Sequence, residues 1–293
     1  MSFDLHHPAT IDEASALALR LGDSAHFIAG GTDLVIQINR KARTPAHLIS
    51  LTRLDPLRGI TEDEDGITIG ALTTHKTIER HDLFSGALAA VAEGARVIGG
   101  HQVRNIATIG GNIANASPAA DLLPPLLVLG AQLVLTTGDA ERVVPLRDFL
   151  LKPGRTTRTI GEILSKIRLP KPDIRSTSAF LKAGRRKAME ISIVSVAASL
   201  SLDPTDGRCR NVRVALGAVA PTAIRASEAE SILEGQTASE ALFGEAGRAA
   251  SRQCSAISDV RASARYRLLL VETMVDRALA ACVARARERH IEG

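Results

Sequence analysis

The spacing of hydrophobic residues near the N-terminus predicts a helix followed by strands and turns. Apolar residues recur at helical spacing after the capping box Thr10-Ile11-Asp12-Glu13, and this pattern predicts a helix that ends at Gly22. Beyond it, residues 26–29 predict a short strand, residues 34–40 a short helix and residues 46–51 another strand. A strand, a glycine turn and a helix therefore follow one another in this part of the chain.

Helical and extended patterns continue to alternate through the middle of the chain. Residues 59–70 predict a hairpin with an acidic, solvated turn, and residues 83–98 predict a helix. The glycine-rich stretch Gly99–Asn115 predicts loop for most of its length. Next we expect a proline-initiated helix over residues 122–131 and a strand over residues 132–137.

A change of composition predicts a boundary between two domains near residue 175. Proline, lysine and threonine gather around Lys152–Gly154, and proline and lysine recur at Pro170–Asp173. We therefore expect one domain over residues 1–175 and a second over residues 176–293.

The second domain is expected to begin with strands and to end with helices. Residues 191–202 and 211–219 predict two antiparallel strands joined by a turn. Residues 261–289 mix apolar residues with many arginines, which favours a long helix with one solvated face over a binding surface.

The overall composition is that of a folded globular protein. Hydrophobic residues make up 45% and charged residues 23% of the 293 residues, which argues against disorder. The longest apolar stretch, Leu122–Leu135, contains two prolines and falls short of the ~20 residues that a membrane helix needs. Because the N-terminus lacks the basic and apolar regions of a secretory signal, we expect a cytoplasmic protein without a membrane span.

The cysteines and charges favour neither metal nor nucleic-acid binding. Cys209, Cys254 and Cys282 are far apart and odd in number, as expected of structural thiols in a reducing compartment. The net charge of +4 is spread along the chain, and with no Trp and one Tyr there are few aromatic platforms for bases. His6, His7, His75, His81 and His101 have no second histidine at the helical spacing of metal ligands, and no motif marks a catalytic nucleophile.

Two segments contain more small residues than a chain connection requires. They are Ala29-Gly30-Gly31-Thr32-Asp33-Leu34 and Thr108–Ser117. Peptide N–H groups in such loops can converge on phosphate oxygens, and threonine and asparagine side chains add donors. A diphosphate ligand would therefore fit. The alternative, that each Gly-Gly pair only turns a corner in the chain, stays open for either segment taken alone.

Neither segment has the spacing of a Rossmann or P-loop motif, so a different cofactor fold is needed. Taken in order, Ala29–Leu34, Thr108-Ile109-Gly110-Gly111-Asn112 and Ala119-Ala120-Asp121 resemble motifs of the FAD-binding medium subunits of molybdenum hydroxylases. This family includes the flavoproteins of xanthine, nicotinate and carbon monoxide dehydrogenases. The resemblance extends from the N-terminus to at least Ser195 and continues more weakly beyond it.

The resemblance implies an α+β fold in two parts. Residues 1–175 would form a vanillyl-alcohol-oxidase-like (PCMH-type) FAD-binding domain of two α+β subdomains. Residues 176–293 would form a smaller α+β domain of the carbon monoxide dehydrogenase flavoprotein C-terminal type.

The resemblance also implies a role for individual residues in binding FAD. The FAD diphosphate would be wrapped by the backbone amides of Phe27, Ile28, Ala29, Gly30, Gly31, Thr32, Asp33 and Leu34. A second clasp would come from Thr108, Ile109, Gly110, Gly111 and Asn112, and Gly99 would approach the cofactor on the preceding loop.

Three further residues would contact the sugar chain and the flavin ring. Asp121 would accept hydrogen bonds from a sugar or ribityl hydroxyl, a task that suits a carboxylate, although it could also cap the following helix. Leu164 would pack on the isoalloxazine ring. Lys182 would lie near the pyrimidine edge, where a cation stabilises the charge of a reduced flavin; without the resemblance it reads as a surface lysine.

The same resemblance implies an oxidoreductase subunit that relays electrons. FAD would be bound noncovalently, because no histidine in either motif is placed for a covalent bond. No cysteine lies between Asn112 and Asp121, so the chain would lack the four-iron cluster that one branch of the family carries there. No molybdenum-pterin or two-iron ferredoxin motif is present, so the molybdenum-pterin cofactor and the 2Fe-2S clusters would belong to a large and a small partner subunit. Electrons would pass to an acceptor such as NAD or a quinone, in a dimer of heterotrimers. The alternatives are a structural subunit without cofactor and a stand-alone NAD(P)H-dependent flavin reductase.

Overall fold

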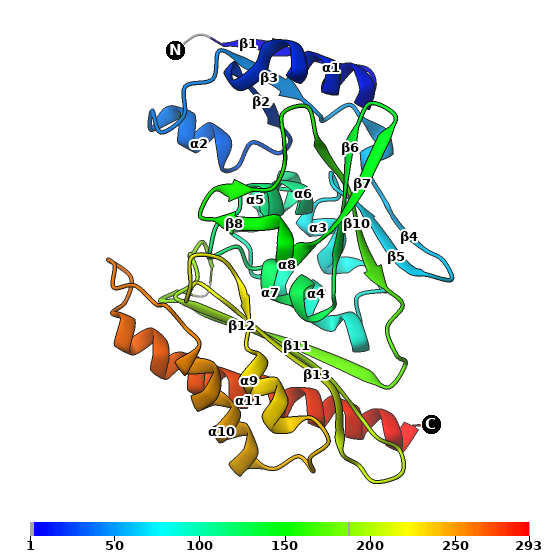
Figure 1. Ribbon diagram of the computed structural model, residues 1–293, viewed down its shortest axis with the longest axis vertical. Coiled ribbons are helices and arrows are strands. Elements are labelled where there is room, and N and C mark those ends of the chain that lie inside the picture. The colour runs from blue at the N-terminus through cyan, green and yellow to red at the C-terminus, as the bar shows by residue number, and fades with distance from the viewer. Residues whose placement is uncertain (1–2, 187, 293) are drawn as a thin grey trace.

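Three sheets follow one another along the long axis of the molecule, with helices packed on and between them (Figure 1). The computed structural model describes residues 3–186 and 188–292, and the side chains as far as Glu288. Among these residues the sheets contain three, five and four strands, and a ribbon of two further strands accompanies them. The mixture of parallel and antiparallel strands with separate helices confirms the α+β class.

The N-terminal sheet is parallel, and the first glycine segment leaves from the end of one of its strands. Its strands lie in the order β1 (Asp4–His6), β3 (His47–Ser50) and β2 (Ala25–Ile28). Helix α1 (Ile11–Leu21) covers the sheet, and the Thr10 hydroxyl accepts a hydrogen bond from the Glu13 amide, as the capping box predicts. Helix α2 (Leu34–Asn39) follows the glycine turn.

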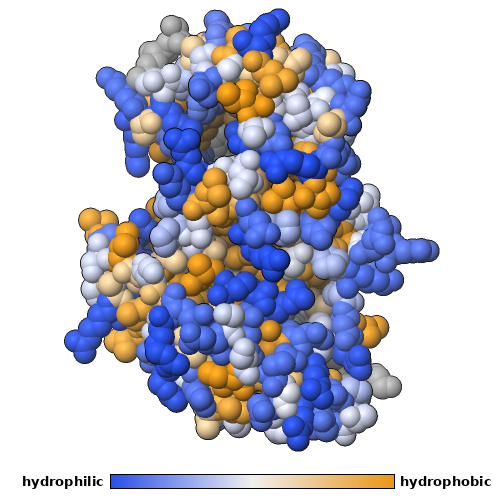
Figure 2. All heavy atoms as spheres, viewed as in Figure 1, coloured by the Kyte–Doolittle hydropathy of each residue, from blue (hydrophilic) through white to orange (hydrophobic). Residues whose placement is uncertain are grey.

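The second sheet is antiparallel and holds the core of the first domain. Its strands lie in the order β4 (Ile60–Glu62), β5 (Gly66–Gly70), β10 (Ile163–Pro170), β6 (Gln132–Thr137) and β7 (Ala140–Pro145). Strands β4 and β5 form the predicted hairpin, and its acidic turn is exposed. Figure 2 shows this turn as a hydrophilic projection at the right edge of the molecule.

Short helices fill the space beside this sheet. They are α3 (His75–Arg80), α4 (Ala89–Arg96), α5 (His101–Ile106), α6 (Ile109–Ala114), α7 (Leu123–Val128) and α8 (Leu146–Phe149), with single 3₁₀ turns at Asp55–Leu57 and Gly86–Leu88. Strands β8 (Leu150–Lys152) and β9 (Arg155–Thr156) form the small ribbon. The helix predicted over residues 83–98 begins only at Ala89, because Gly86 turns the chain with a positive φ of 52°.

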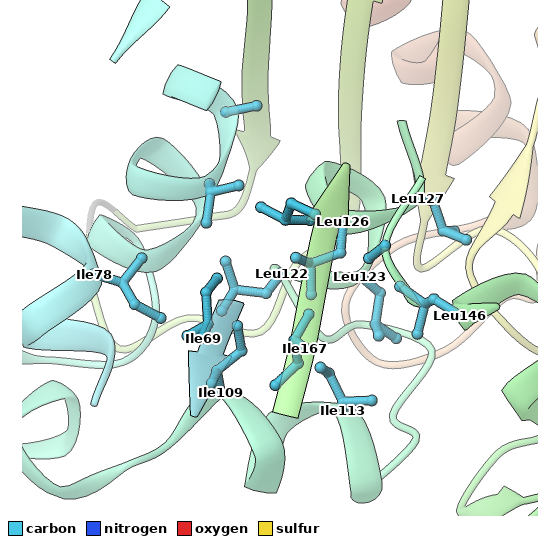
Figure 3. Packing of buried hydrophobic residues seen from close by; sticks show 14 of the residues in the cluster. Ile69, Ile78, Ile109, Ile113, Leu122, Leu123, Leu126, Leu127, Leu146 and Ile167 are labelled. Atoms are coloured by element: carbon cyan, nitrogen blue, oxygen red, sulfur yellow. The ribbon is translucent and has the colours of Figure 1, made fainter. Parts of the chain in front are cut away.

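The stretch Gly99–Asn115, which the sequence predicts to be mostly loop, instead contains helices α5 and α6. Two glycines make α6 a poor helix by intrinsic propensity. Its Ile109 and Ile113 are nevertheless fully buried against Ile69 of β5 and Ile167 of β10 (Figure 3). Each such side chain contributes about 1.5–3 kcal/mol when buried, so tertiary packing stabilises this short helix.

The second domain places a four-stranded antiparallel sheet against three helices. Its elements are β11 (Ser176–Ala183), β12 (Val194–Leu202), β13 (Cys209–Gly217), β14 (Ile224–Arg225), α9 (Ser227–Leu233), α10 (Glu240–Arg252) and α11 (Ala264–Glu292). The apolar face of α11 packs on the sheet, and most of the arginines whose side chains are described on this helix are exposed, as predicted. Burial raises the pKa of the Cys282 thiol to about 12, as expected of a structural cysteine. In the described part of the chain, no helix combines the length and apolar character that spanning a bilayer requires.

The two domains are joined by a network of hydrogen bonds around Glu93 on α4. Its carboxylate accepts a bond of 2.7 Å from the amide of Phe180 on β11 and pairs with Arg285 on α11. Arg285 also donates to the carbonyl of Ser178, and the Ser178 hydroxyl accepts a bond from the amide of Ala90. The second domain is therefore fixed to α4 by main-chain and charged groups together.

We expect Glu93→Ala to lower the free energy of unfolding by about 1–3 kcal/mol, because the Phe180 amide and the Arg285 guanidinium lose their acceptor. Denaturant unfolding followed by circular dichroism measures the loss. The matched control is Glu141→Ala, which removes an exposed pair with Lys166 and is expected to cost less than about 0.5 kcal/mol. Equal losses in the two variants would contradict this role of Glu93.

Candidate functional site

The fold brings the two glycine segments together, although about 80 residues separate them in the sequence. A Cβ atom at Gly30 would lie 2.0 Å from the carbonyl oxygen of Ile106, at the end of α5. The Gln37 side chain on α2 donates a hydrogen bond of 3.1 Å to Asn115, just after α6. The end of β2 and the start of α6 are therefore neighbours, which a glycine at residue 30 permits.

The first segment presents a run of free backbone donors. Among the described residues, none accepts a hydrogen bond from the amides of residues 29–34, while the amide of Val35 returns to Gly31. The segment is half-buried except at Asp33, which is exposed and makes no capping bond to α2. Unpaired amides in a partly buried loop favour an anionic ligand, because each would otherwise lack an acceptor.

The second segment is tied into the framework more tightly than the first. The amides of Ile109 and Gly110 donate to the carbonyls of Thr73 and Ala71, at 3.0 and 2.9 Å. A Cβ atom at Gly110 would lie 2.6 Å from the Cβ of Ala71, so this glycine permits close packing on β5. These two amides are therefore occupied within the protein, and the predicted clasp depends on the side chains beside them.

Two side chains of the second segment can still reach a ligand. The Thr108 hydroxyl accepts a bond of 3.1 Å from the amide of Gly111, and its own proton remains available to donate. The Asn112 Oδ1 atom is buried, and no described residue donates to it. A buried acceptor without a donor is unfavourable, so a ligand hydroxyl or N–H would stabilise this position. Together with the free amides of the first segment, these groups fit a cofactor that carries a diphosphate and hydroxyls.

A buried ion pair lies where the first domain meets the second. The Lys182 Nζ atom on β11 donates to Oδ2 of Asp121 at 2.6 Å, to the carbonyl of Glu190 at 2.9 Å and to that of Val97 at 3.1 Å. The Ser192 hydroxyl donates to the other carboxylate oxygen of Asp121. Asp121 is 6% exposed and Ser192 fully buried. Asp121 thus takes its partners from the second domain and does not cap α7, whose first turn has no side-chain cap.

The electrostatic balance at Asp121 depends on these partners. Burial raises the pKa of its carboxyl above the ordinary value, while the charge of Lys182 and the bonds from Lys182 and Ser192 lower it. A carboxylate with two donors and one adjacent cation can stay ionised in a buried position.

The remaining predicted residues, Gly99 and Leu164, lie in different settings. Gly99 has a positive φ of 51°, and its carbonyl accepts a bond of 3.3 Å from the amide of Met189, so the loop before Ser192 lies over this turn. Leu164 is 6% exposed within the core of the first domain. Its packing on a flavin ring stays a prediction, as do the other assigned contacts with the cofactor.

Sequence reasoning missed Ser192 and the backbone carbonyls of Val97 and Glu190. The three groups come from separate segments, and no spacing or motif in the sequence links them to Lys182 or Asp121. Only the tertiary structure shows that these groups surround Lys182 and Asp121.

Comparison with protein families and known proteins gives consistent matches over nearly the whole chain. Residues 1–172 match the family described as the FAD binding domain in molybdopterin dehydrogenase. Residues 179–282 match the CO dehydrogenase flavoprotein C-terminal domain.

Curated proteins and solved structures agree with the family matches. The chain is 32% identical to the carbon monoxide dehydrogenase medium chain of Afipia carboxidovorans, over 98% of both chains. It is 34% identical to the xanthine dehydrogenase FAD-binding subunit of Escherichia coli O157:H7, over 96% of both. A chain of carbon monoxide dehydrogenase from Hydrogenophaga pseudoflava, in a form lacking the Mo-pyranopterin moiety, superposes with a TM-score of 0.93 at 33% identity, covering 97% of this chain and 98% of that one.

We expect Lys182→Met to lower the free energy of unfolding by about 3–5 kcal/mol at pH 8, because it leaves the buried Asp121 carboxylate without its cation. Without Lys182 the folded-state pKa of Asp121 rises further above its unfolded value of about 3.9. Stability that depends on the protonated carboxyl is present at low pH and is lost as pH rises through this raised pKa. The deficit relative to the wild type should therefore shrink at pH 5.

Urea unfolding of the variant and the wild type at both pH values measures this difference. Lys166→Met removes a lysine from a more exposed pair with Glu141 and serves as the control, with no expected change between the two pH values. A deficit of Lys182→Met that is the same at pH 5 and pH 8 would contradict the assignment.

Proposed function

Because the chain belongs to the family of FAD-binding subunits of molybdopterin dehydrogenases, we propose that it binds FAD noncovalently and relays electrons from a partner's iron–sulfur centres to an acceptor such as NAD or a quinone. The family identifies the chain as a subunit of an oxidoreductase. The route of the electrons and the acceptor are our proposal. We retain residues 1–175 and 176–293 as the proposed domains.

The observation that carries the proposal is the run of six free amides at residues 29–34 beside the second glycine segment. A diphosphate has enough acceptor oxygens to satisfy several of these amides at once, and glycine lets the backbone approach them closely. The Thr108 hydroxyl and Asn112 Oδ1 supply a donor and an acceptor for the polar groups next to the diphosphate. Phe27 and Ile28 belong to β2 and hold this loop in place.

The Lys182–Asp121 pair would serve the flavin end of the cofactor. Two of the roughly four acceptor positions of the Asp121 carboxylate are used by Lys182 and Ser192, which leaves positions for a sugar or ribityl hydroxyl. Three acceptors occupy the Lys182 ammonium, so we propose that it acts on the flavin through its charge rather than through a direct hydrogen bond. FAD, when bound, takes up and releases electrons singly or in pairs and so links iron–sulfur centres to a two-electron acceptor.

The other redox centres are proposed to belong to partner subunits. With three cysteines, two of them buried, this chain has too few ligands for two-iron clusters. Relatives are described as medium chains or as FAD-binding subunits, which supports further subunits beside this chain. We propose that these are a large molybdenum-pterin subunit and a small 2Fe-2S subunit, in a dimer of such heterotrimers. We propose the cytoplasm as the location of the complex.

We expect the purified chain, alone or with its co-purifying partners, to show a flavin absorption spectrum that acid precipitation releases into the supernatant. Gly30→Ala should weaken FAD binding about tenfold or more, because the new Cβ displaces the loop from the Ile106 carbonyl. Gly244→Ala is the matched control, since a Cβ at that position of α10 would meet only the end of the Arg248 side chain. Flavin retained by the precipitated chain would contradict noncovalent binding, and a colourless wild type that refuses FAD would favour the structural subunit.

The electron relay is tested by running it in reverse on the purified complex. NADH or a hydroquinone should reduce the flavin and the partner's iron–sulfur centres, as followed by their visible absorption. After removal of FAD neither donor should reduce those centres, because the relay passes through the flavin, and added FAD should restore reduction. Reduction that persists without FAD would exclude the relay. Rapid NADH oxidation by the isolated chain with a soluble acceptor would instead identify a stand-alone flavin reductase.

A further inference from the structure

Ser192 lies outside both glycine segments, yet its hydroxyl is bonded to one of the two oxygens of the buried Asp121 carboxylate. It is fully buried, and its hydroxyl donates to Oδ1 of Asp121, while Lys182 donates to Oδ2 at 2.6 Å. The Asp121 carboxylate therefore cannot rotate without breaking a hydrogen bond from the second domain.

The backbone next to Ser192 is held on both sides. The amide of Ile193 donates to the carbonyl of Ala183 at 2.9 Å. The carbonyl of Ile193 accepts a bond from Arg267 on α11. Arg267 is 2% exposed, and the same Nη1 atom also donates to the carbonyl of Ala218 at 3.1 Å. The buried Arg267 guanidinium thus holds the backbone immediately after Ser192 in place.

The same arginine reaches the Asp121 loop by a second route. The amide of Ala218, whose carbonyl Arg267 holds, donates to the carbonyl of Pro118 at 2.8 Å. The loop from Pro118 to Asp121 is therefore held near its start by Ala218 and at its end by Ser192. Both contacts come from the second domain and converge on Arg267.

We propose that Ser192 is a positioning residue of the FAD site, an inference that rests on the proposed function. Its hydrogen bond holds the Asp121 carboxylate in one orientation and keeps it ionised, so that the carboxylate can accept a hydroxyl of the cofactor. Ser192 itself does not contact the cofactor, because its buried hydroxyl is engaged with Asp121.

The charged groups around Asp121 make its ionisation sensitive to Ser192. Lys182 on β11 is the adjacent cation. Glu190, in the loop before Ser192, has its carboxylate paired with Arg185 and Arg186. On α4, the uncharged Gly94 lies against the backbone carbonyl of Asp121. Burial raises the pKa of Asp121, and the donors lower it. Without the Ser192 hydroxyl one of these donors is lost, so the pKa rises further and the carboxyl keeps its proton to a higher pH.

Ser195→Ala is a closely matched control for Ser192→Ala. Ser195 lies three residues further along the same segment and is equally buried, and no described residue bonds to its hydroxyl. Both substitutions remove one buried hydroxyl, but only Ser192→Ala removes a hydrogen bond to Asp121. Ser192→Cys keeps nearly the volume of serine and replaces the hydroxyl with a weak donor, so it serves if the alanine variant folds poorly.

The experiment measures FAD affinity by flavin fluorescence from pH 5 to pH 9 for the wild type and the three variants. Ser192→Ala should raise the Kd for FAD about tenfold at pH 7, as expected for losing a hydrogen bond to a charged group. The pH below which affinity falls should move upward by about one unit. Ser192→Cys should shift both in the same direction, and Ser195→Ala should stay within about twofold of the wild type.

Each outcome decides the proposal. The expected difference between the Ser192 variants and Ser195→Ala, with the shifted pH profile, supports it. Equal affinities in the two alanine variants, or a weaker affinity without a shift in pH dependence, would reduce Ser192 to a packing residue and overturn it. A wild type that binds no FAD would overturn the proposed function and this inference together. In the other outcomes the wild type binds FAD, so the proposed function stands whatever the role of Ser192.

Discussion

The close approach of two backbones at Gly30 and Ile106 is the constraint on which the first domain depends. A side chain at residue 30 would collide with the Ile106 carbonyl, so the end of β2 can lie against the end of α5 only because that side chain is absent. Gly110 extends the same close packing from α6 to Ala71 beside β5. As a result the free amides of the first glycine segment lie next to the polar side chains of the second, and two segments that are distant in the sequence become neighbours.

The second domain supplies both hydrogen-bond partners of Asp121, the residue proposed to bind a cofactor hydroxyl. Asp121 belongs to the first domain, but its two hydrogen-bond donors, Lys182 and Ser192, belong to the second. The Glu93 network and the bond between Ala218 and Pro118 fix the position of the second domain relative to the first around that carboxylate. A buried charge tolerates little displacement of its partners, so the properties of the site depend on the rigidity of the junction.

The sequence predicts those parts of the molecule that local patterns determine. The capping box and apolar period define the helix after Thr10, and the acidic turn defines the hairpin of β4 and β5. Helix α6 is not predicted because its two glycines are weak helix formers, and the helix is stabilised instead by burial of Ile109 and Ile113. The glycine segments, Asp121 and Lys182 are recognisable as motifs. Ser192 is not, because its importance arises only where chain segments 71 residues apart meet.

The distribution of the Asp121 partners along the chain sets an order for biosynthesis. Chains emerge from the ribosome N-terminus first, so both glycine segments are available well before Lys182, Ser192 and Ala218. Arg267, which anchors the last two, emerges later still, in the final helix. A nascent chain that ends before α11 already contains both glycine segments, but it lacks the arginine that holds the segments around Asp121. The proposed cofactor site can therefore reach its folded arrangement only after α11 has been synthesised.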